Sequence, residues 1–258
     1  MNDAELLYER RGPAAIITFN RPQARNAMTF AMYEALVERC AEADADDGVR
    51  VLVLRGAGGK AFVAGTDIRQ FLDFESGETG IDYERDIDRY VGSLESVSKP
   101  TVAVIEGYAT GSGLAMSAAC DLRVCTPDAY FGVPIAKTVG NCLSTANYAR
   151  LVASLGAART KALLFTADFM SSGEARALGF VVAVVEPNAF DAELDALCDR
   201  IATYAPITLQ VTREAIRRIV GRSLADGDDL VRRAYESSDF HEGVTAFVEK
   251  RPPRWEGR

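Results

Sequence analysis

Short apolar runs alternate with helical patterns over the first half of the chain. Continuous runs rich in β-branched residues predict strands at residues 14–19, 51–54, 102–105 and 122–125. Helical spacing of apolar positions predicts helices after Thr29, which can cap the first of them, and over residues 82–94 and 111–119. Because strands and helices alternate in this way, the pattern predicts an α/β architecture.

The pattern changes after Tyr130. Segments 143–154, 157–166 and 173–178 have helical spacing, and Ser171 with Glu174 forms a capping-box sequence before the last of these. Residues 181–185 predict one more strand. From Phe190 onward only helical patterns follow, at 190–204, 207–220, 225–238 and 242–249. We therefore expect an α/β core in residues 1–190 and a helical module in residues 191–258.

Composition narrows the functional classes. The net charge of −8 argues against nucleic acid as a partner, and no apolar run is long enough to cross a membrane. The five cysteines form no metal-ligand pattern, so we expect reduced core cysteines, no metal site and a cytoplasmic protein. His241 is the single histidine of the chain, which leaves little scope for histidine-based catalysis.

Two glycine-rich segments each join a predicted strand to a predicted helix. In the first, Ala64-Gly65-Thr66 leads into a helix that we expect to begin around Asp67. The second is residues 106–115, with the sequence EGYATGSGLA. Backbone N–H groups at a helix start point outward, and two of them aimed at one carbonyl oxygen would form an oxyanion hole. Taken singly, each segment is equally typical of tight helix–sheet packing, and neither fits a dinucleotide-binding or P-loop pattern.

The order of several motifs resembles the enoyl-CoA hydratase/isomerase (crotonase) family. The motifs are ITFNRP at 17–22, RNAM at 25–28, AGTDI at 64–68, GYATGSG at 107–113, ACDLR at 119–123, YFG at 130–132, ARALG at 175–179 and GVTAFVEKR at 243–251. The resemblance implies a fold of repeated β-β-α units with a C-terminal helical trimerisation module. It also implies an acyl-CoA thioester as substrate, with no cofactor besides the coenzyme A of that substrate, and a homotrimer or homohexamer.

The resemblance also implies roles for particular residues. The oxyanion hole would consist of the backbone N–H groups of Thr66 and Ser112. Coenzyme A would be bound by residues of both glycine-rich segments and of the chain termini: Arg25, Ala27, Ala64, Asp67, Ile68, Gly111, Phe247 and Lys250. Phe247 and Lys250, from this or a neighbouring subunit, would approach the adenine and phosphate end. Asp67 could instead cap a helix, and Lys250 could be a solvated helix end.

The sequence departs from the family at the positions of the two glutamates that its hydratases use as acid and base. Ala115 stands at the first position and Ile135 at the second. No carboxylate residue occurs between Gly107 and Cys120 or between Ala129 and Ala167, so a small alignment shift does not restore either one. Because positioned acid–base catalysis contributes about 10²–10⁴-fold, ordinary hydration should be nearly silent.

Several alternatives remain open. A carboxylate could come from Asp73, Glu75 or Glu78, although each is more typical of a solvated segment. Neutral groups could act instead, from the set Thr138, Asn141, Cys142, Ser144 and Tyr148, although capping or packing explains each of them, as for Ser144 before the next helix. Cys142 lacks a nearby histidine base and is a poor nucleophile. We expect an enzyme of this family that stabilises a thioester enolate. The alternatives are a catalytically weak acyl-CoA-binding scaffold and a decarboxylase or C–C lyase.

Overall fold

Two sheets run through the protein. A computed structural model describes residues 4–71, 77–220, Ser238, Glu242, Ala246, Glu249, Arg251 and 253–258. The larger sheet has the order β1-β2-β3-β5-β7-β10, with bounds Leu6–Arg11, Ala14–Phe19, Val51–Gly56, Thr101–Ile105, Leu122–Cys125 and Ala183–Val184. The smaller sheet has the order β4-β6-β8-β9, with bounds Ala61–Val63, Tyr108–Thr110, Tyr130–Gly132 and Met170–Ser171. Neighbouring strands are parallel except in the pairs β1–β2 and β8–β9.

Helices follow the strands in a repeating order. The α-helices are α1 Phe30–Ala45, α2 Gly77–Ser96, α3 Ser112–Ala119, α4 Ile135–Thr138, α5 Thr145–Thr166, α6 Ser172–Ala177, α7 Phe190–Ala202 and α8 Pro206–Val220. Short 3-10 helices are η1 Pro22–Ala24, η2 Ile68–Phe71 and η3 Pro187–Ala189. In three successive units, a strand of the larger sheet is followed by one of the smaller sheet and then by a helix: β3-β4-α2, β5-β6-α3 and β7-β8-α4. This is the repeated β-β-α order that the family resemblance implies.

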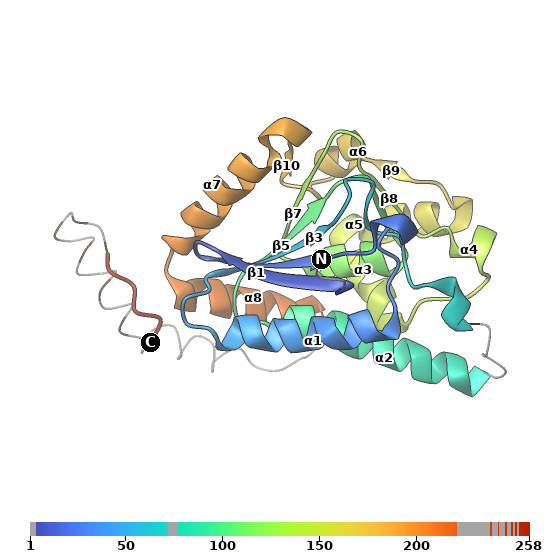
Figure 1. The fold of residues 1–258 in the computed structure, drawn as a ribbon, viewed down its shortest axis with the longest axis horizontal. Coiled ribbons are helices and arrows are strands. Elements are labelled where there is room, and N and C mark those ends of the chain that lie inside the picture. Colours follow the sequence, from blue (N-terminus) through green and yellow to red (C-terminus); the bar gives the residue numbers. More distant parts are fainter. Residues whose placement is uncertain are drawn as a thin grey trace.

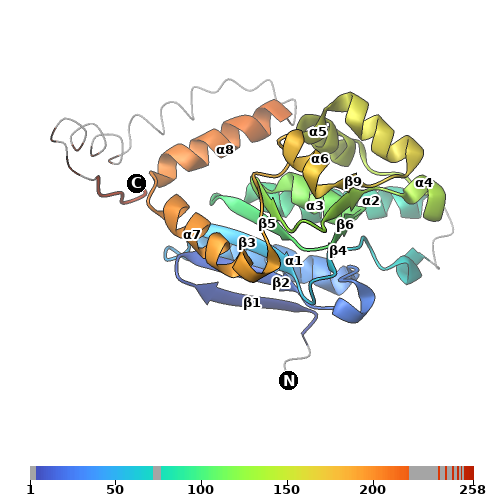
Figure 2. The ribbon, with the colours of Figure 1, turned by 90° about the horizontal axis from the view of Figure 1, so that it is seen from above.

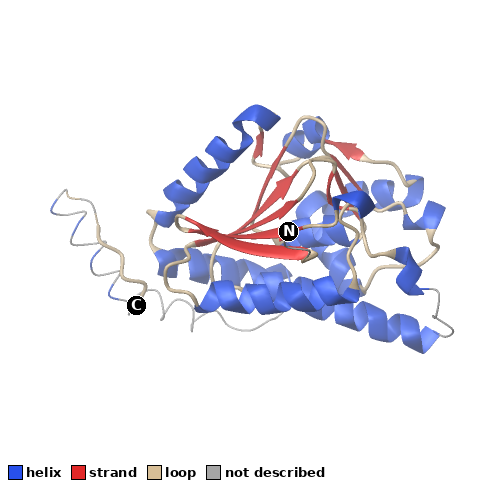
Figure 3. Ribbon diagram, viewed as in Figure 1, coloured by secondary structure: helices blue, strands red, loops and turns tan. Residues whose placement is uncertain are grey.

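Helices cover both faces of the larger sheet (Figures 1 and 3). On one face, Phe190, Leu194, Cys198 and Ile201 of α7 pack against alternate side chains of β2, β3, β5 and β7. The opposite side chains of the same strands join α1, α2 and α3 in the main core. Figure 2 shows that α8 turns away from the end of α7 and runs toward α5, which it contacts. After β10 the described residues contain no further strand, as predicted, and the division near residue 190 stays a prediction.

The local elements largely follow the predictions. Thr29 caps α1, Ser144 caps α5, and Ser171 with Glu174 forms the expected capping box of α6. One prediction is wrong in detail, because the helix expected around Asp67 is the short 3-10 helix η2. The two helices expected at 143–154 and 157–166 are present as the two parts of α5, which the non-helical Gly156 (φ 76°) separates by a kink. The helices predicted at 225–238 and 242–249 lie mostly outside the described residues.

Candidate functional site

The two glycine-rich segments meet at the amino end of α3. Gly65 accepts a hydrogen bond from Met28 N–H (2.8 Å), and Asp67 N–H donates to Met28 (2.9 Å), so Thr66 lies in an isolated parallel bridge. On the other segment, Gly111 has φ 55° and precedes the first residue of α3. A Cβ on Gly111 would lie 3.6 Å from Gly65 Cα, so the two segments lie next to each other with little more than the space of one methyl group between them. The predicted convergence of the segments is therefore present.

Gly113 fixes how closely α3 approaches strand β4. A Cβ at this position would lie 2.1 Å from the carbonyl oxygen of Val63, far inside van der Waals contact. Only glycine allows the first turn of α3 to lie against the strand that leads into Ala64 and Thr66. This close approach holds the start of α3 beside Thr66.

The N–H groups of Thr66 and Ser112 remain available for a ligand. Among the described residues, neither donates a backbone hydrogen bond or a bond to a side chain. For Ser112 the reason is its place as the first residue of α3, where helical N–H groups have no partner within the helix. For Thr66 the reason is the bridge to Met28, whose two hydrogen bonds use the carbonyl of Gly65 and the N–H of Asp67 and leave the Thr66 N–H unused. Two unpaired donors on neighbouring segments are one requirement of an oxyanion hole.

A buried hydroxyl network lies behind Thr66. Its Oγ1 is 2.8 Å from the Tyr33 hydroxyl and 2.7 Å from the Tyr83 hydroxyl. Burial raises the pKa of Tyr33 to about 12, against the opposing effect of the Ser112 and Thr66 hydroxyls, and burial also raises the pKa of Tyr83. The Ser112 hydroxyl lies close to Tyr33 but makes no hydrogen bond of normal geometry with any described residue. The network holds the Thr66 side chain in place, and burial keeps both tyrosines neutral.

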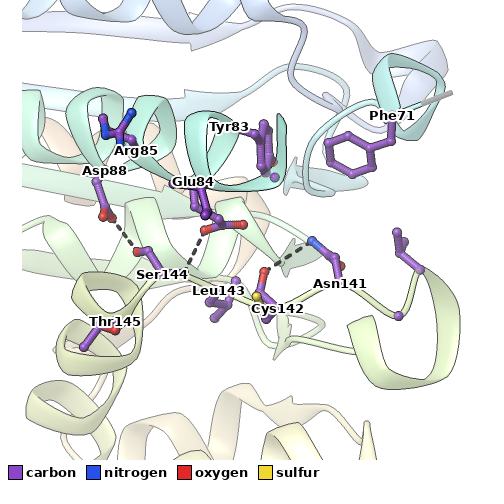
Figure 4. Close-up of a pocket in the computed structure, with 14 residues that line it drawn as sticks. Phe71, Tyr83, Glu84, Arg85, Asp88, Asn141, Cys142, Leu143, Ser144 and Thr145 are labelled. Atoms are coloured by element: carbon purple, nitrogen blue, oxygen red, sulfur yellow. Dashed lines mark hydrogen bonds between the residues drawn. The ribbon is translucent and has the colours of Figure 1, made fainter. Parts of the chain in front are cut away.

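A cavity opens beside the unpaired N–H groups. The side chains at its wall come from the 64–71 segment, α2, α3, α4 and the 138–147 segment: Ala64, Thr66, Ile68, Phe71, Tyr83, Glu84, Ile87, Ser112, Ala115, Ile135, Thr138, Asn141, Leu143 and Asn147 among them. Its volume is about 110 Å³. It adjoins a larger cavity of about 850 Å³ between α2 and residues 139–145, and Phe71, Tyr83, Glu84 and Leu143 line both (Figure 4).

Ala115 and Ile135 lie in the inner cavity beside Thr66 and Ser112. Ala115 is buried in the first turns of α3, and Ile135 is the first residue of α4. Ala115 and Ile135, which the motif resemblance sets at the positions of the family's glutamates, therefore line the space beside these two N–H groups. The wall next to the N–H pair is apolar on this side.

The residues expected to bind coenzyme A divide into two groups. Ala64, Ile68 and Gly111 line the inner cavity, whereas Arg25, Ala27 and Asp67 do not. Arg25 is exposed in a left-handed conformation (φ 51°), with its guanidinium 6.0 Å from the centre of the Tyr108 ring. The carbonyl of Ala27 accepts a 2.6 Å hydrogen bond from Arg21. Phe247 and Lys250 lie outside the described residues.

Asp67 is held by arginines. Its carboxylate accepts hydrogen bonds from the Arg69 side chain (2.6 and 3.0 Å) and from Arg21 (3.1 Å), and a weaker one from Arg69 N–H (3.3 Å). These bonds hold the pKa of Asp67 well below its ordinary value, and the bonds from the Arg69 side chain have the largest effect. The geometry therefore favours the structural alternative that the sequence left open, a carboxylate that caps the turn η2. Its contact with coenzyme A stays a prediction.

The neutral polar candidates have different surroundings. Thr138 lines the inner cavity, Asn141 lines both cavities, and Cys142 and Ser144 line the outer one. Ser144 caps α5, with its hydroxyl accepting from Asn147 N–H (3.1 Å), and the Tyr148 hydroxyl accepts from Leu143 N–H (3.4 Å). The expectation that all cysteines are core residues is wrong for Cys142, which is exposed, whereas the other four are buried.

The carboxylate at the cavity is one that the sequence analysis missed. Glu78 is exposed and lines neither cavity, and Asp73 and Glu75 lie outside the described residues. Glu84, on the next turns of α2, lines both cavities and accepts a 2.7 Å hydrogen bond from Ser144 N–H (Figure 4). The sequence feature that could have pointed to Glu84 is its spacing from Asp88, because residues four apart lie on one face of the predicted helix. Nothing local in the sequence shows that this face meets the glycine-rich segments.

Two further classes of site are absent from the described part of the chain. No cluster of histidine, cysteine, aspartate or glutamate there could hold a metal ion. None of its helices combines the length and the apolar character that a membrane span requires.

Comparisons with known proteins agree with the fold and the motifs. The family model described as Enoyl-CoA hydratase/isomerase matches residues 9–258. The Short-chain-enoyl-CoA hydratase of Clostridium acetobutylicum is 30% identical over 250 residues, covering 95% of this chain and 95% of that protein. The Enoyl-CoA hydratase domain-containing protein 2, mitochondrial, of Bos taurus is 34% identical over 251 residues, covering 94% of this chain and 84% of that protein.

Solved structures lead to the same class. The crystal structure of an enoyl-CoA hydratase/carnithine racemase from Magnetospirillum magneticum superposes with a TM-score of 0.90 at 31% identity, covering 99% of this chain and 96% of that chain. The α/β architecture with its repeated β-β-α units is thus the crotonase fold. The chain belongs to the enoyl-CoA hydratase/isomerase family, as the motif resemblance predicted.

Proposed function

We propose that this protein is an acyl-CoA thioester enzyme that stabilises an enolate in an oxyanion hole. The observation that carries the proposal is the pair of unpaired N–H groups, Thr66 and Ser112, on two neighbouring segments at the wall of a cavity. Family membership supplies the substrate class, because the named relatives are enoyl-CoA hydratases.

The proposed chemistry begins at the thioester carbonyl. Its oxygen would accept hydrogen bonds from both N–H groups, whose positions are fixed before substrate binds. When a proton or another group leaves the carbon next to the carbonyl, negative charge moves onto this oxygen. Donors that are already in place stabilise this charge without reorganisation, and loss of one donor typically costs about 10²–10³-fold in rate. The dipole at the start of α3 acts in the same direction.

The apolar replacements at Ala115 and Ile135 decide which reaction is expected. Hydration of a 2-enoyl thioester needs an activated water and a proton donor, and the two usual carboxylates are absent. Reactions in which one group can take a proton from the substrate and return it, such as isomerisation of a 3-enoyl thioester, require less of the protein. We therefore propose such a reaction ahead of rapid hydration. The proposal includes a homotrimer or homohexamer, with residues 191–258 in its assembly, and no cofactor besides the coenzyme A of the substrate.

The test is turnover of a panel of CoA thioesters, followed by mass spectrometry. The panel holds 2-enoyl, 3-enoyl, β-keto and malonyl thioesters of short and long chain. We expect turnover of at least one member at enzymatic rates. Tight binding of the panel without turnover would contradict the proposal and favour an acyl-CoA-binding scaffold.

A substitution at Ser112 connects this activity to the N–H pair. Ser112→Pro removes the N–H at the first position of α3, where proline is well tolerated, and should lower turnover by about 10²-fold with little loss of stability. Ser172→Pro is the matched control, because Ser172 is the first residue of α6 and lies outside the site. Equal turnover in the two variants would exclude the Ser112 N–H from the reaction.

A further inference from the structure

The inner cavity has one carboxylate among its described lining residues. It belongs to Glu84 of α2, whereas α3 and α4 contribute Ala115 and Ile135. Glu84 also lines the outer cavity, where Figure 4 shows it beside Tyr83 and Leu143, so its side chain borders both cavities. A carboxylate thus reaches the space beside the N–H pair from α2, not from the two elements that provide it in the family's hydratases.

Glu84 is held by a hydrogen bond but has no cationic partner among the described residues. Its Oε2 accepts the hydrogen bond from Ser144 N–H, and no ion pair to Glu84 occurs within the described ranges. Asp88, one turn further along α2, differs in this respect. It accepts a hydrogen bond from the Ser144 hydroxyl (2.5 Å) and forms an ion pair with Arg150 (3.4 Å). Of these two acids at the outer cavity, Asp88 has a structural role and Glu84 keeps an oxygen for a ligand.

The charges around Glu84 favour proton exchange near neutral pH. The titratable side chains beside it are Tyr83, Arg85 and Asp88 of α2 and Cys142 of the facing segment. Arg85 is paired with Asp82 (2.7 Å) and is therefore not its counter-ion. Burial, with the nearby Asp88 charge, raises the pKa of Glu84 to about 7, although the Ser144 N–H opposes this shift.

Glu84 also lies within electrostatic reach of the oxyanion region. The pKa of Tyr33 and that of Tyr83 are raised mainly by burial, and the Glu84 charge adds to both effects. These two hydroxyls are the ones bonded to the Thr66 side chain. The carboxylate and the N–H pair therefore belong to one electrostatic site.

We propose that Glu84 is the catalytic base and acid that removes and returns the proton on the carbon next to the thioester carbonyl. This inference rests on the proposed function. The C–H bond breaks as an O–H bond forms on Glu84. The electron pair of the C–H bond forms the new C–C double bond, and the π pair of the carbonyl moves onto the carbonyl oxygen. The Thr66 and Ser112 N–H groups hold the resulting enolate. Return of the proton to the same or to a conjugated carbon completes exchange or isomerisation.

The test is deuterium incorporation into butyryl-CoA in D₂O, measured by mass spectrometry with the full-length protein. Wild-type protein should exchange the protons next to the carbonyl, with a rate that rises through about pH 7 as Glu84 ionises. Glu84→Gln keeps an oxygen that can accept the Ser144 N–H but cannot take a proton. It should lower the exchange rate at least 100-fold, with little change in the concentration of butyryl-CoA that half-saturates the protein.

Three comparisons separate the possible outcomes. Asp86→Asn is the matched control, because Asp86 is an exposed acid on α2 that lines neither cavity, and it should exchange at the wild-type rate. Glu84→Asp should recover part of the activity and keep a pH-dependent rate, which a purely structural role would not give. Equal exchange by wild type and Glu84→Gln would overturn the role of Glu84 and leave the proposed function standing. Absence of exchange in the wild type, together with no turnover of the thioester panel, would overturn both.

Discussion

Adding one methyl group at Gly113 should impair both the fold and the site. The Cβ of an alanine would lie 2.1 Å from Val63 O, 2.9 Å from Val63 C and 3.0 Å from Val63 Cβ. Ordinary contact begins at about 3.4 Å, so the start of α3 must move away from β4 by roughly 1 Å or deform. The neighbouring Ser112 N–H moves with it.

Two opposing free energies set the size of the effect on stability. Overpacking of this kind costs about 1–3 kcal/mol, and the better helix propensity of alanine returns up to about 1 kcal/mol. We expect a net loss of about 1–2 kcal/mol, which corresponds to a fall in Tm of about 2–8 °C for a chain of this size. Catalysis should suffer more, because a shift of about 1 Å in a positioned group can cost about 10²-fold in rate.

The assay compares Gly113→Ala with Gly173→Ala by thermal unfolding and by turnover. Gly173 is the second residue of α6, as Gly113 is of α3, but a Cβ there meets nothing within 4 Å. The Gly173 variant should keep wild-type turnover and equal or higher stability. If the two variants are equally stable and equally active, the contact between α3 and β4 does not position the site, and the reasoning is refuted.

Two further changes test the electrostatics of the site. Ile135→Glu places a carboxylate in the cavity wall at the start of α4 and should raise hydration of a short 2-enoyl-CoA at least tenfold over wild type. An Ile135→Gln variant that hydrates equally fast would rule out acid–base catalysis as the cause. Asp67→Asn weakens the bonds with Arg69 and Arg21 and should lower the free energy of unfolding by about 1–3 kcal/mol at pH 7. Because the folded pKa of Asp67 lies below its unfolded value near 4, this stabilisation is present above pH 4 and is lost as pH falls further. Urea unfolding across that range should show the gap between wild type and variant closing, and a gap independent of pH would contradict the pairing.

Local hydrogen-bond chemistry explains which elements could be predicted. Thr29, Ser144 and Ser171 cap helices as their sequence context indicates, because a capping side chain needs only a partner two or three residues away. Strand β2 was predicted with its observed bounds, since its side chains are nearly all buried and form one continuous apolar run. Strand β1, which was missed, is an edge strand with a half-exposed surface and three charged residues in LLYERR.

The smaller sheet could not be predicted because its strands are only two or three residues long. β4, β6, β8 and β9 exist through pairing between segments far apart in sequence, and such short runs have no periodicity of their own. The same limit applies to the site. The order of the motifs predicted that Thr66 and Ser112 act together. It also predicted apolar residues, Ala115 and Ile135, at the positions of the family's two glutamates. Glu84 reaches the cavity only because α2 packs across it, and this contact leaves no local pattern in the sequence.

The most direct test of the oxyanion hole is the infrared stretching frequency of the thioester carbonyl in the bound state. Butyryl-CoA labelled with ¹³C at the carbonyl would be measured free, bound to wild-type protein and bound to Ser112→Pro. Hydrogen bonds from the Thr66 and Ser112 N–H groups should polarise the carbonyl, so we expect a lower frequency on binding to wild type and a smaller shift with the variant. A bound carbonyl that absorbs at the frequency of free butyryl-CoA, or one whose shift is the same in the variant, would contradict the assignment of these two N–H groups.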